Sequence, residues 1–126
     1  MPALIVFFGA GIGGVARYLL AGWMQAGAGP AFPWGTLAIN VTGSLILAVV
    51  YSMLDGSAGT AEWRLFLGVG ICGGYTTFST FSWETVRLMQ DGDWTGASAY
   101  VIASVIGSLA ATILGFRIGA SLLARS

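Results

Sequence analysis

Four hydrophobic segments constrain the fold of this chain more than any other feature of its sequence. Each contains about 20 or more mostly apolar residues, the length that a helix needs to cross the hydrocarbon core of a bilayer. The segments are residues 3–24, 34–54, 65–89 and 95–123. We therefore expect an all-α membrane protein with four transmembrane helices.

Charged residues are too few to cover the surface of a soluble domain. They make up 8% of the 126 residues, against about 25% in soluble proteins. The five basic and five acidic side chains give a net charge of zero, which leaves no basic surface for a nucleic acid. The chain has no histidine and a single cysteine, Cys72. We therefore expect no internal disulfide and no enzyme of the Ser–His or Cys–His type.

Short connections join the hydrophobic segments, at residues 25–33, 55–64 and 90–94. Connections of this length place neighbouring helices antiparallel. None of them is long enough to separate domains, so residues 1–126 are expected to form one domain. No basic residue precedes the first apolar segment, which we therefore interpret as a retained helix and not a secretory signal.

The arginines are spread almost evenly over the two ends of the expected bundle. Arg64 and Arg125 would lie at the end that holds both termini, with Arg117 inside the last helix. Arg87 would lie at the other end, with Arg17 near it. Positive charge on the cytoplasmic side normally sets the orientation of a membrane protein. A balance this close permits insertion in both orientations; the alternative is one orientation set by Arg64 and Arg125.

Pairs of small residues four positions apart occur in three of the segments. Such pairs allow helix backbones to approach closely in a membrane. We expect most of them to pack within one chain, although four helices of this size leave little room for a pore, so a dimer is the expected functional unit. The pairs are Gly9/Gly13, Ala10/Gly14, Gly70/Gly74 and Gly115/Gly119.

Polar side chains recur every four residues in the second and fourth segments, which places each set on one helix face. The second segment carries Thr36, Asn40 and Ser44. The Asn40 amide offers two N–H donors and an acceptor, and its simpler role is a hydrogen bond between helices. The fourth segment carries a hydroxyl stripe: Tyr100, Ser104, Ser108 and Thr112.

The third segment contains the most specific motif, the string GGYTTFSTFSWE at residues 73–84. Glycine weakens a helix, and serine and threonine side chains compete for its backbone hydrogen bonds. We therefore predict that this helix is broken near the middle of the bilayer. The freed carbonyl groups are suited to a cation, as in discontinuous transporter helices; a hinge without a ligand is the alternative.

Two phenylalanines, Phe78 and Phe81, alternate with hydroxyl residues in this string. The edge of an aromatic ring is positive, so a dehydrated anion could rest against it while hydroxyl and amide groups replace its water. The commoner role of a phenylalanine in a membrane is contact with lipid or another helix. With no lysine or histidine to trap the ion, the arrangement suits conduction.

These motifs resemble the Fluc (CrcB) fluoride-channel family. The resemblance rests on residues 73–84, on GTLAIN at 35–40, on residues 13–17 and on GSLAAT at 107–112. It implies a dual-topology, antiparallel homodimer in the prokaryotic inner membrane. Such a dimer has two pores and exports fluoride passively from the cytoplasm, which gives fluoride resistance.

The resemblance also implies roles for individual residues in the pore. Phe78 and Phe81 would form the aromatic contacts to fluoride, and Asn40 would be an amide donor. Tyr100 would lie near one end of the pore. The expected polar track consists of Ser79, Thr80, Ser108 and Thr112.

Four further residues take roles outside the pore by the same resemblance. The backbone carbonyls of Gly73 and Thr76, from both subunits, would hold a structural sodium ion on the two-fold axis. Glu84 would shape an ion entrance. Arg17 matches an arginine of the first helix with a structural or electrostatic role.

Two other functions are compatible with a small four-helix membrane protein. A dual-topology multidrug transporter needs a carboxylate inside the membrane to exchange protons for a cationic drug. The first segment has no acidic residue, and Glu84 lies towards the end of the third. A membrane scaffold would explain the glycines but not the hydroxyl string.

Overall fold

The computed structural model describes residues 1–55 and 61–126, and every regular element in these residues is helical. Three of the helices are long and apolar enough to cross a membrane. These are α1 (Pro2–Ala28), α2 (Trp34–Met53) and α6 (Trp94–Arg125). Between α2 and α6 the chain forms a discontinuous run: α3 (Ala61–Trp63), η1 (Arg64–Cys72), α4 (Gly73–Tyr75) and α5 (Phe78–Gln90). The prediction of an all-α fold is confirmed for the described residues.

Two of the expected connections differ from the structure at their edges. The connection expected at residues 25–33 begins later, because α1 stays helical to Ala28 and ends at Gly29, whose φ is 84°. The connection expected at 90–94 is shorter, since Gln90 ends α5 and Trp94 begins α6. The connection expected at 55–64 lies partly outside the described residues.

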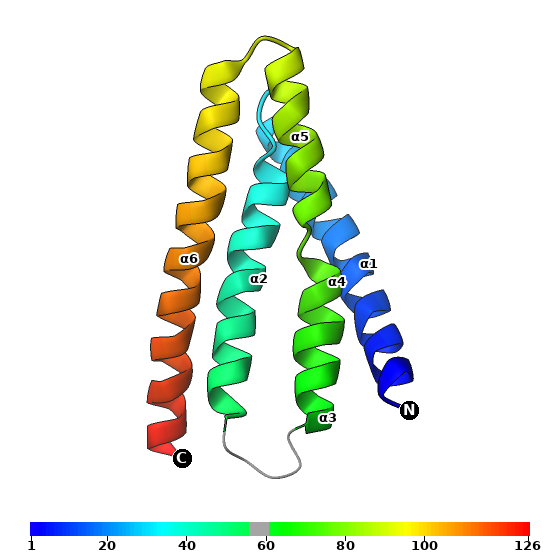
Figure 1. The fold of residues 1–126 in the computed structure, drawn as a ribbon, viewed down its shortest axis with the longest axis vertical. Coiled ribbons are helices and arrows are strands. Elements are labelled where there is room, and N and C mark those ends of the chain that lie inside the picture. The colour runs from blue at the N-terminus through cyan, green and yellow to red at the C-terminus, as the bar shows by residue number, and fades with distance from the viewer. Residues whose placement is uncertain (56–60) are drawn as a thin grey trace.

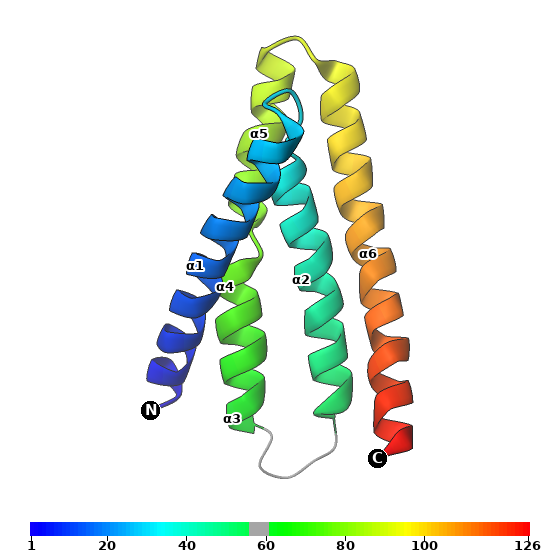
Figure 2. The same ribbon diagram turned by 180° about the vertical axis from the view of Figure 1, so that it is seen from behind.

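The long elements run side by side from one end of the molecule to the other (Figure 1). Both termini lie at one end, and the α5–α6 connection lies at the opposite end. Seen from behind, α1 leans across the discontinuous run while α2 lies between that run and α6 (Figure 2). Accordingly, α2 packs mainly against α6, and α1 packs mainly against η1 and α4.

Glycines allow the closest of these contacts. A Cβ atom at Gly13 would collide with the backbone of Ile71, and one at Gly74 would collide with the backbone of Ala10. Three of the four expected small-residue pairs thus pack within the chain: Gly9/Gly13, Gly70/Gly74 and Gly115/Gly119. In the fourth pair, Gly14 faces open space.

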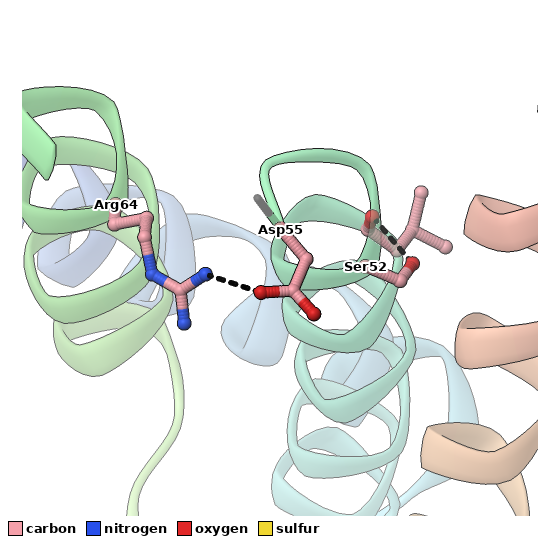
Figure 3. Close-up of polar contacts among 4 residues, drawn as sticks. Ser52, Asp55 and Arg64 are labelled. Atoms are coloured by element: carbon pink, nitrogen blue, oxygen red, sulfur yellow. Dashed lines mark hydrogen bonds and ion pairs between the residues drawn. The ribbon is translucent and has the colours of Figure 1, made fainter. Parts of the chain in front are cut away.

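A small charged cluster lies at the end of the bundle that holds the termini. The Arg64 Nη1 atom lies 3.9 Å from Asp55 Oδ1, and the guanidinium carbon lies 4.5 Å from the centre of the Tyr51 ring. Figure 3 shows this ion pair beside Ser52, whose hydroxyl donates to the Val49 carbonyl at 3.0 Å. Because the Asp55 side chain is 86% exposed, the ion pair contributes little to stability.

Candidate ion site at the helix break

The predicted break in the third hydrophobic segment is confirmed. Helix α4 ends at Tyr75, α5 begins at Phe78, and Thr76 and Thr77 between them have extended backbone conformations. The Thr77 hydroxyl accepts a hydrogen bond from the Thr80 backbone N–H at 3.3 Å, which caps α5. The competition between threonine side chains and backbone groups therefore ends one helix and starts the next.

Asn40 of α2 stabilises the break from the neighbouring helix. Its amide nitrogen donates to the Thr77 carbonyl at 3.1 Å, and its amide oxygen accepts from the Thr77 N–H at 2.8 Å. Both backbone groups that the break leaves without helical partners at Thr77 are thereby satisfied. Asn40 does connect two helices, and the second N–H of its amide has no partner among the described residues.

Arg17 of α1 caps the end of α4. Its Nε atom donates to the Gly74 carbonyl at 3.1 Å. A cation at the C-terminal end of a helix interacts favourably with the helix dipole. The structure thus assigns Arg17 a role that its sequence position left open.

The carbonyl oxygens of Gly73 and Thr76 flank this cap. Neither accepts a hydrogen bond from any of the described residues. Backbone carbonyls are hard oxygen donors, the kind that sodium and similar cations prefer. Residues 1–55 and 61–126 contain no cluster of three or more histidine, cysteine or acidic side chains suited to a metal ion. Two backbone carbonyls without hydrogen-bond partners among the described residues therefore lie at the break.

A cleft of about 370 Å³, here named the phenylalanine cleft, lies beside the break. The Phe78 and Phe81 rings are tilted by 46° with their centres 5.6 Å apart, and Phe81 also packs 5.2 Å from the ring of Tyr100. Phe78 is 79% exposed in the single chain. Polar groups and rings meet in this cleft: Asn40, Ser44, Phe78, Phe81, Ser104 and Ser108.

Ser104 differs from the other buried polar side chains of the described residues in its hydrogen bonding. Its hydroxyl oxygen is buried and has no hydrogen-bond partner within the described chain. The sequence indicated Ser104 through the four-residue stripe, but the residue was not among the expected pore residues. In contrast, the expected pore residue Thr112 donates to the Ser108 carbonyl of its own helix at 2.9 Å, and it does not line the cleft.

A second cleft, here named the inner cleft, has a volume of about 420 Å³. Its polar lining consists of Arg17, Gln25, Thr36, Thr77, Thr80 and Glu84. Thr77 lines both this cleft and the phenylalanine cleft. The expected polar track is therefore divided in the single chain, because Thr80 faces the inner cleft and Ser108 faces the phenylalanine cleft. Ser79 is exposed and lies 3.5 Å from the Thr77 hydroxyl.

Glu84 of α5 is held by two hydroxyl groups at the wall of the inner cleft. The Thr36 hydroxyl donates to Glu84 Oε1 at 2.9 Å, and the Tyr100 hydroxyl donates to Oε2 at 2.7 Å. Tyr100 is fully buried. Helices α2, α5 and α6 are thus joined at the carboxylate, and Tyr100 contacts both Glu84 and the ring of Phe81.

A third cleft, here named the outer cleft, has a volume of about 370 Å³ and lies on the other side of Glu84. Its lining includes Pro30 and Pro33 from the α1–α2 connection and Arg87 and Asp91 from the end of α5. Outer, inner and phenylalanine clefts follow one another along the chain's surface, each sharing residues with the next. Each of the three clefts contains polar side chains within a largely apolar lining.

Comparisons with known proteins place the chain in a family. The family described as CrcB-like protein, Camphor Resistance (CrcB) matches residues 4–116. A fluoride-specific ion channel FluC from Geobacter sulfurreducens is 50% identical over 112 residues, covering 88% of this chain and 90% of the relative. The FluC of Nitrobacter winogradskyi is 46% identical over 121 residues, with 91% and 92% covered. The FluC of Rhodospirillum rubrum is 42% identical over 127 residues, with 98% and 97% covered.

Proposed function

The chain belongs to the CrcB family and is a fluoride-specific ion channel of the membrane, and from this premise we propose how it conducts. Two copies form an antiparallel, dual-topology homodimer that exports fluoride passively from the cytoplasm. A channel catalyses no covalent reaction, so the protein is not an enzyme. Family membership also decides against the multidrug transporter.

Each copy crosses the prokaryotic inner membrane four times in this proposal. Helices α1, α2 and α6 are three of the crossings, and the discontinuous run of residues 61–90 is the fourth. The break at Thr76 and Thr77 then lies at mid-depth, where free backbone groups are tolerated only if protein or a polar cavity receives them. The hydrogen bonds from Arg17 and Asn40 meet that requirement at Gly74 and Thr77.

Fluoride passes the break in the phenylalanine cleft, and the gathering of Asn40, Ser104 and the two phenylalanine rings in that cleft is the observation that carries this proposal. The spare N–H of Asn40 and the unpartnered hydroxyl of Ser104 are donors that replace water around the ion. The positive edges of Phe78 and Phe81 add weak attraction. No lysine or arginine lines this cleft, so the ion is bound weakly enough to leave.

The second copy completes each pore. Phe78 is 79% exposed in one chain. In the proposed dimer, the second copy covers this ring. The polar track then gathers hydroxyl residues from α5 and α6: Ser79, Thr80, Ser108 and Thr112. Tyr100 and Glu84 stand where fluoride enters from the inner cleft.

A sodium ion fits the two carbonyls that the break leaves free. Gly73 and Thr76 of each copy would hold it on the two-fold axis. Bound there, the ion would supply positive charge that offsets the partial negative charge of these carbonyl oxygens. The chain itself keeps those carbonyls out of the helical hydrogen-bond pattern. It does so by stabilising the break, since Arg17 donates a hydrogen bond to Gly74 and Asn40 donates one to Thr77.

Fluoride efflux from liposomes that contain the purified protein tests this function. We expect efflux well above that of protein-free liposomes and no comparable efflux of chloride. Phe81→Ile, which removes the ring edge, should lower fluoride efflux about tenfold. The matched control is Phe8→Ile, because Phe8 lies on the exposed side of α1. Equal efflux from both variants would exclude the aromatic contact, and efflux no faster than the protein-free background would exclude the channel.

A further inference from the structure

We propose that Gln25 is a positioning residue that sets the shape of the ion entrance around Glu84. The inference rests on the proposed function. The side-chain amide of Gln25, on the last turn of α1, makes three hydrogen bonds to the backbone that follows. Its Nε2 atom donates to the carbonyls of Gly29 at 2.5 Å and Phe32 at 2.9 Å. Its Oε1 atom accepts from the Gly35 N–H at 3.1 Å.

These three bonds fasten the α1–α2 connection to the end of α1. Both amide protons of Gln25 are used, and one oxygen lone pair is used. No donor is left for an ion, so Gln25 acts on the pathway through the backbone that it holds and not by direct contact.

The backbone that Gln25 holds is linked to Glu84 in two ways, indirectly through Phe32 and directly through Thr36. Phe32 packs edge-on against Tyr100, with the ring centres 5.5 Å apart and an interplanar angle of 82°. Tyr100 donates to Glu84 Oε2. On the other side, Thr36 follows Gly35 directly and donates to Glu84 Oε1. The orientation of both carboxylate oxygens therefore depends on a segment that one glutamine holds.

Gln25 also lies on the proposed pathway of the ion. Gln25 and Glu84 both line the outer cleft and the inner cleft. An ion that moves from one cleft to the other passes between these two side chains. A neutral amide at this point adds no charge beside a carboxylate that already repels anions. The position of the Glu84 carboxylate, set by the segment that Gln25 holds, then governs how readily fluoride enters.

A flux experiment over a series of fluoride concentrations tests the inference. Gln25→Met keeps the length of the side chain and removes its amide. We expect the concentration that gives half-maximal efflux to rise about tenfold, while the maximal efflux stays within about twofold. A loss of folded channels would instead lower efflux by the same factor at every concentration. The matched control is Gln90→Met, since Gln90 is exposed at the end of α5 and should behave as the parent protein.

Phe32→Leu provides a second variant if Gln25→Met does not fold. It keeps all three Gln25 hydrogen bonds and removes the ring contact to Tyr100, and it should raise the half-maximal concentration in the same direction. An unchanged profile in the folded variants, or a uniform loss at every concentration, overturns the positioning role. Absence of fluoride efflux from the parent protein would instead refute the proposed function, so the two failures are distinguishable.

Discussion

At the scale of single residues, an unpartnered buried hydroxyl is a costly feature to retain. Leaving such a group without a hydrogen bond costs about 1–3 kcal/mol, and Ser104 is in this state within the described chain. In the proposed pathway, a fluoride ion in the phenylalanine cleft would be the missing partner. The regular stripe of hydroxyls in the sequence could not indicate that Ser104 lacks a hydrogen-bond partner; the structure shows it.

Ser104→Ala should accordingly lower fluoride efflux about tenfold, which corresponds to the loss of one hydrogen bond to a charged partner. The fold should not lose stability, since the hydroxyl makes no bond within the chain. The measurement is efflux from liposomes together with the unfolding temperature in detergent. Ser98→Ala is the control, because Ser98 is exposed on the same helix. Efflux equal to that of the control would remove Ser104 from the pathway.

Replacing Asn40 is expected to lower stability as well as fluoride efflux, because its amide bonds to the backbone of the break and also faces the ion. Asn40→Ala leaves the N–H and carbonyl of Thr77 without partners, at a cost of about 1–3 kcal/mol for each group. Both the unfolding temperature and the fluoride efflux should therefore fall. Ile46→Val, at an exposed position of α2, serves as the control. A stable Asn40→Ala protein would mean that the break does not depend on this pair of hydrogen bonds.

At the scale of elements, the packing of α1 on the discontinuous run depends on which glycines face it. Gly13→Ala would place a methyl group against the backbone of Ile71, and backbone cannot move aside as a flexible side chain can. We expect a loss of about 1–3 kcal/mol or more. Gly11→Ala, two residues away in open space, should leave stability unchanged. The unfolding temperature of the two variants in detergent gives the comparison, and equal values would contradict this packing.

The positions of the helices followed from hydropathy, and the break followed from the run of hydroxyl residues after Gly73 and Gly74. Both are local properties of the chain, so a sequence pattern can indicate them. The pairing of Asn40 with Thr77 and of Arg17 with Gly74 joins residues far apart in sequence. Such pairs depend on the register between helices, which no single segment encodes.

Other features of these elements had no sequence signal. Residues Arg64–Cys72 form a π-helix, η1, although such helices are rare and usually last a single turn. Their composition resembles that of any apolar helix. Gln25 fell in a segment expected to be a connection, and its role became visible only with the backbone that it holds.

At the scale of the whole molecule, the antiparallel dimer requires that the chain insert in both orientations. Arg64 and Arg125 lie at the end that holds the termini and Arg87 lies at the other end, whereas Arg17, expected near Arg87, instead bonds to Gly74 at the break; the cluster at one end pairs Arg64 with Asp55 at 3.9 Å. Acidic residues affect orientation little, so the arginines alone decide it. Shifting their balance should therefore shift the population of orientations, and with it the fraction of chains that find an oppositely oriented partner.

Replacing Arg64 and Arg125 together by alanine removes basic residues from the end that holds the termini. We expect that end to move mostly to the outside, whereas the parent protein presents it on both sides about equally. Arg87→Ala, at the opposite end, should shift the balance the other way. Protease access to a C-terminal tag in intact cells measures the orientation, and fluoride efflux measures the functional dimers. Efflux should fall in either biased variant and recover when the two are expressed together, because each supplies the orientation that the other lacks. If the tag of the parent protein were found on only one side of the membrane while efflux remained full, this result would contradict the antiparallel dimer.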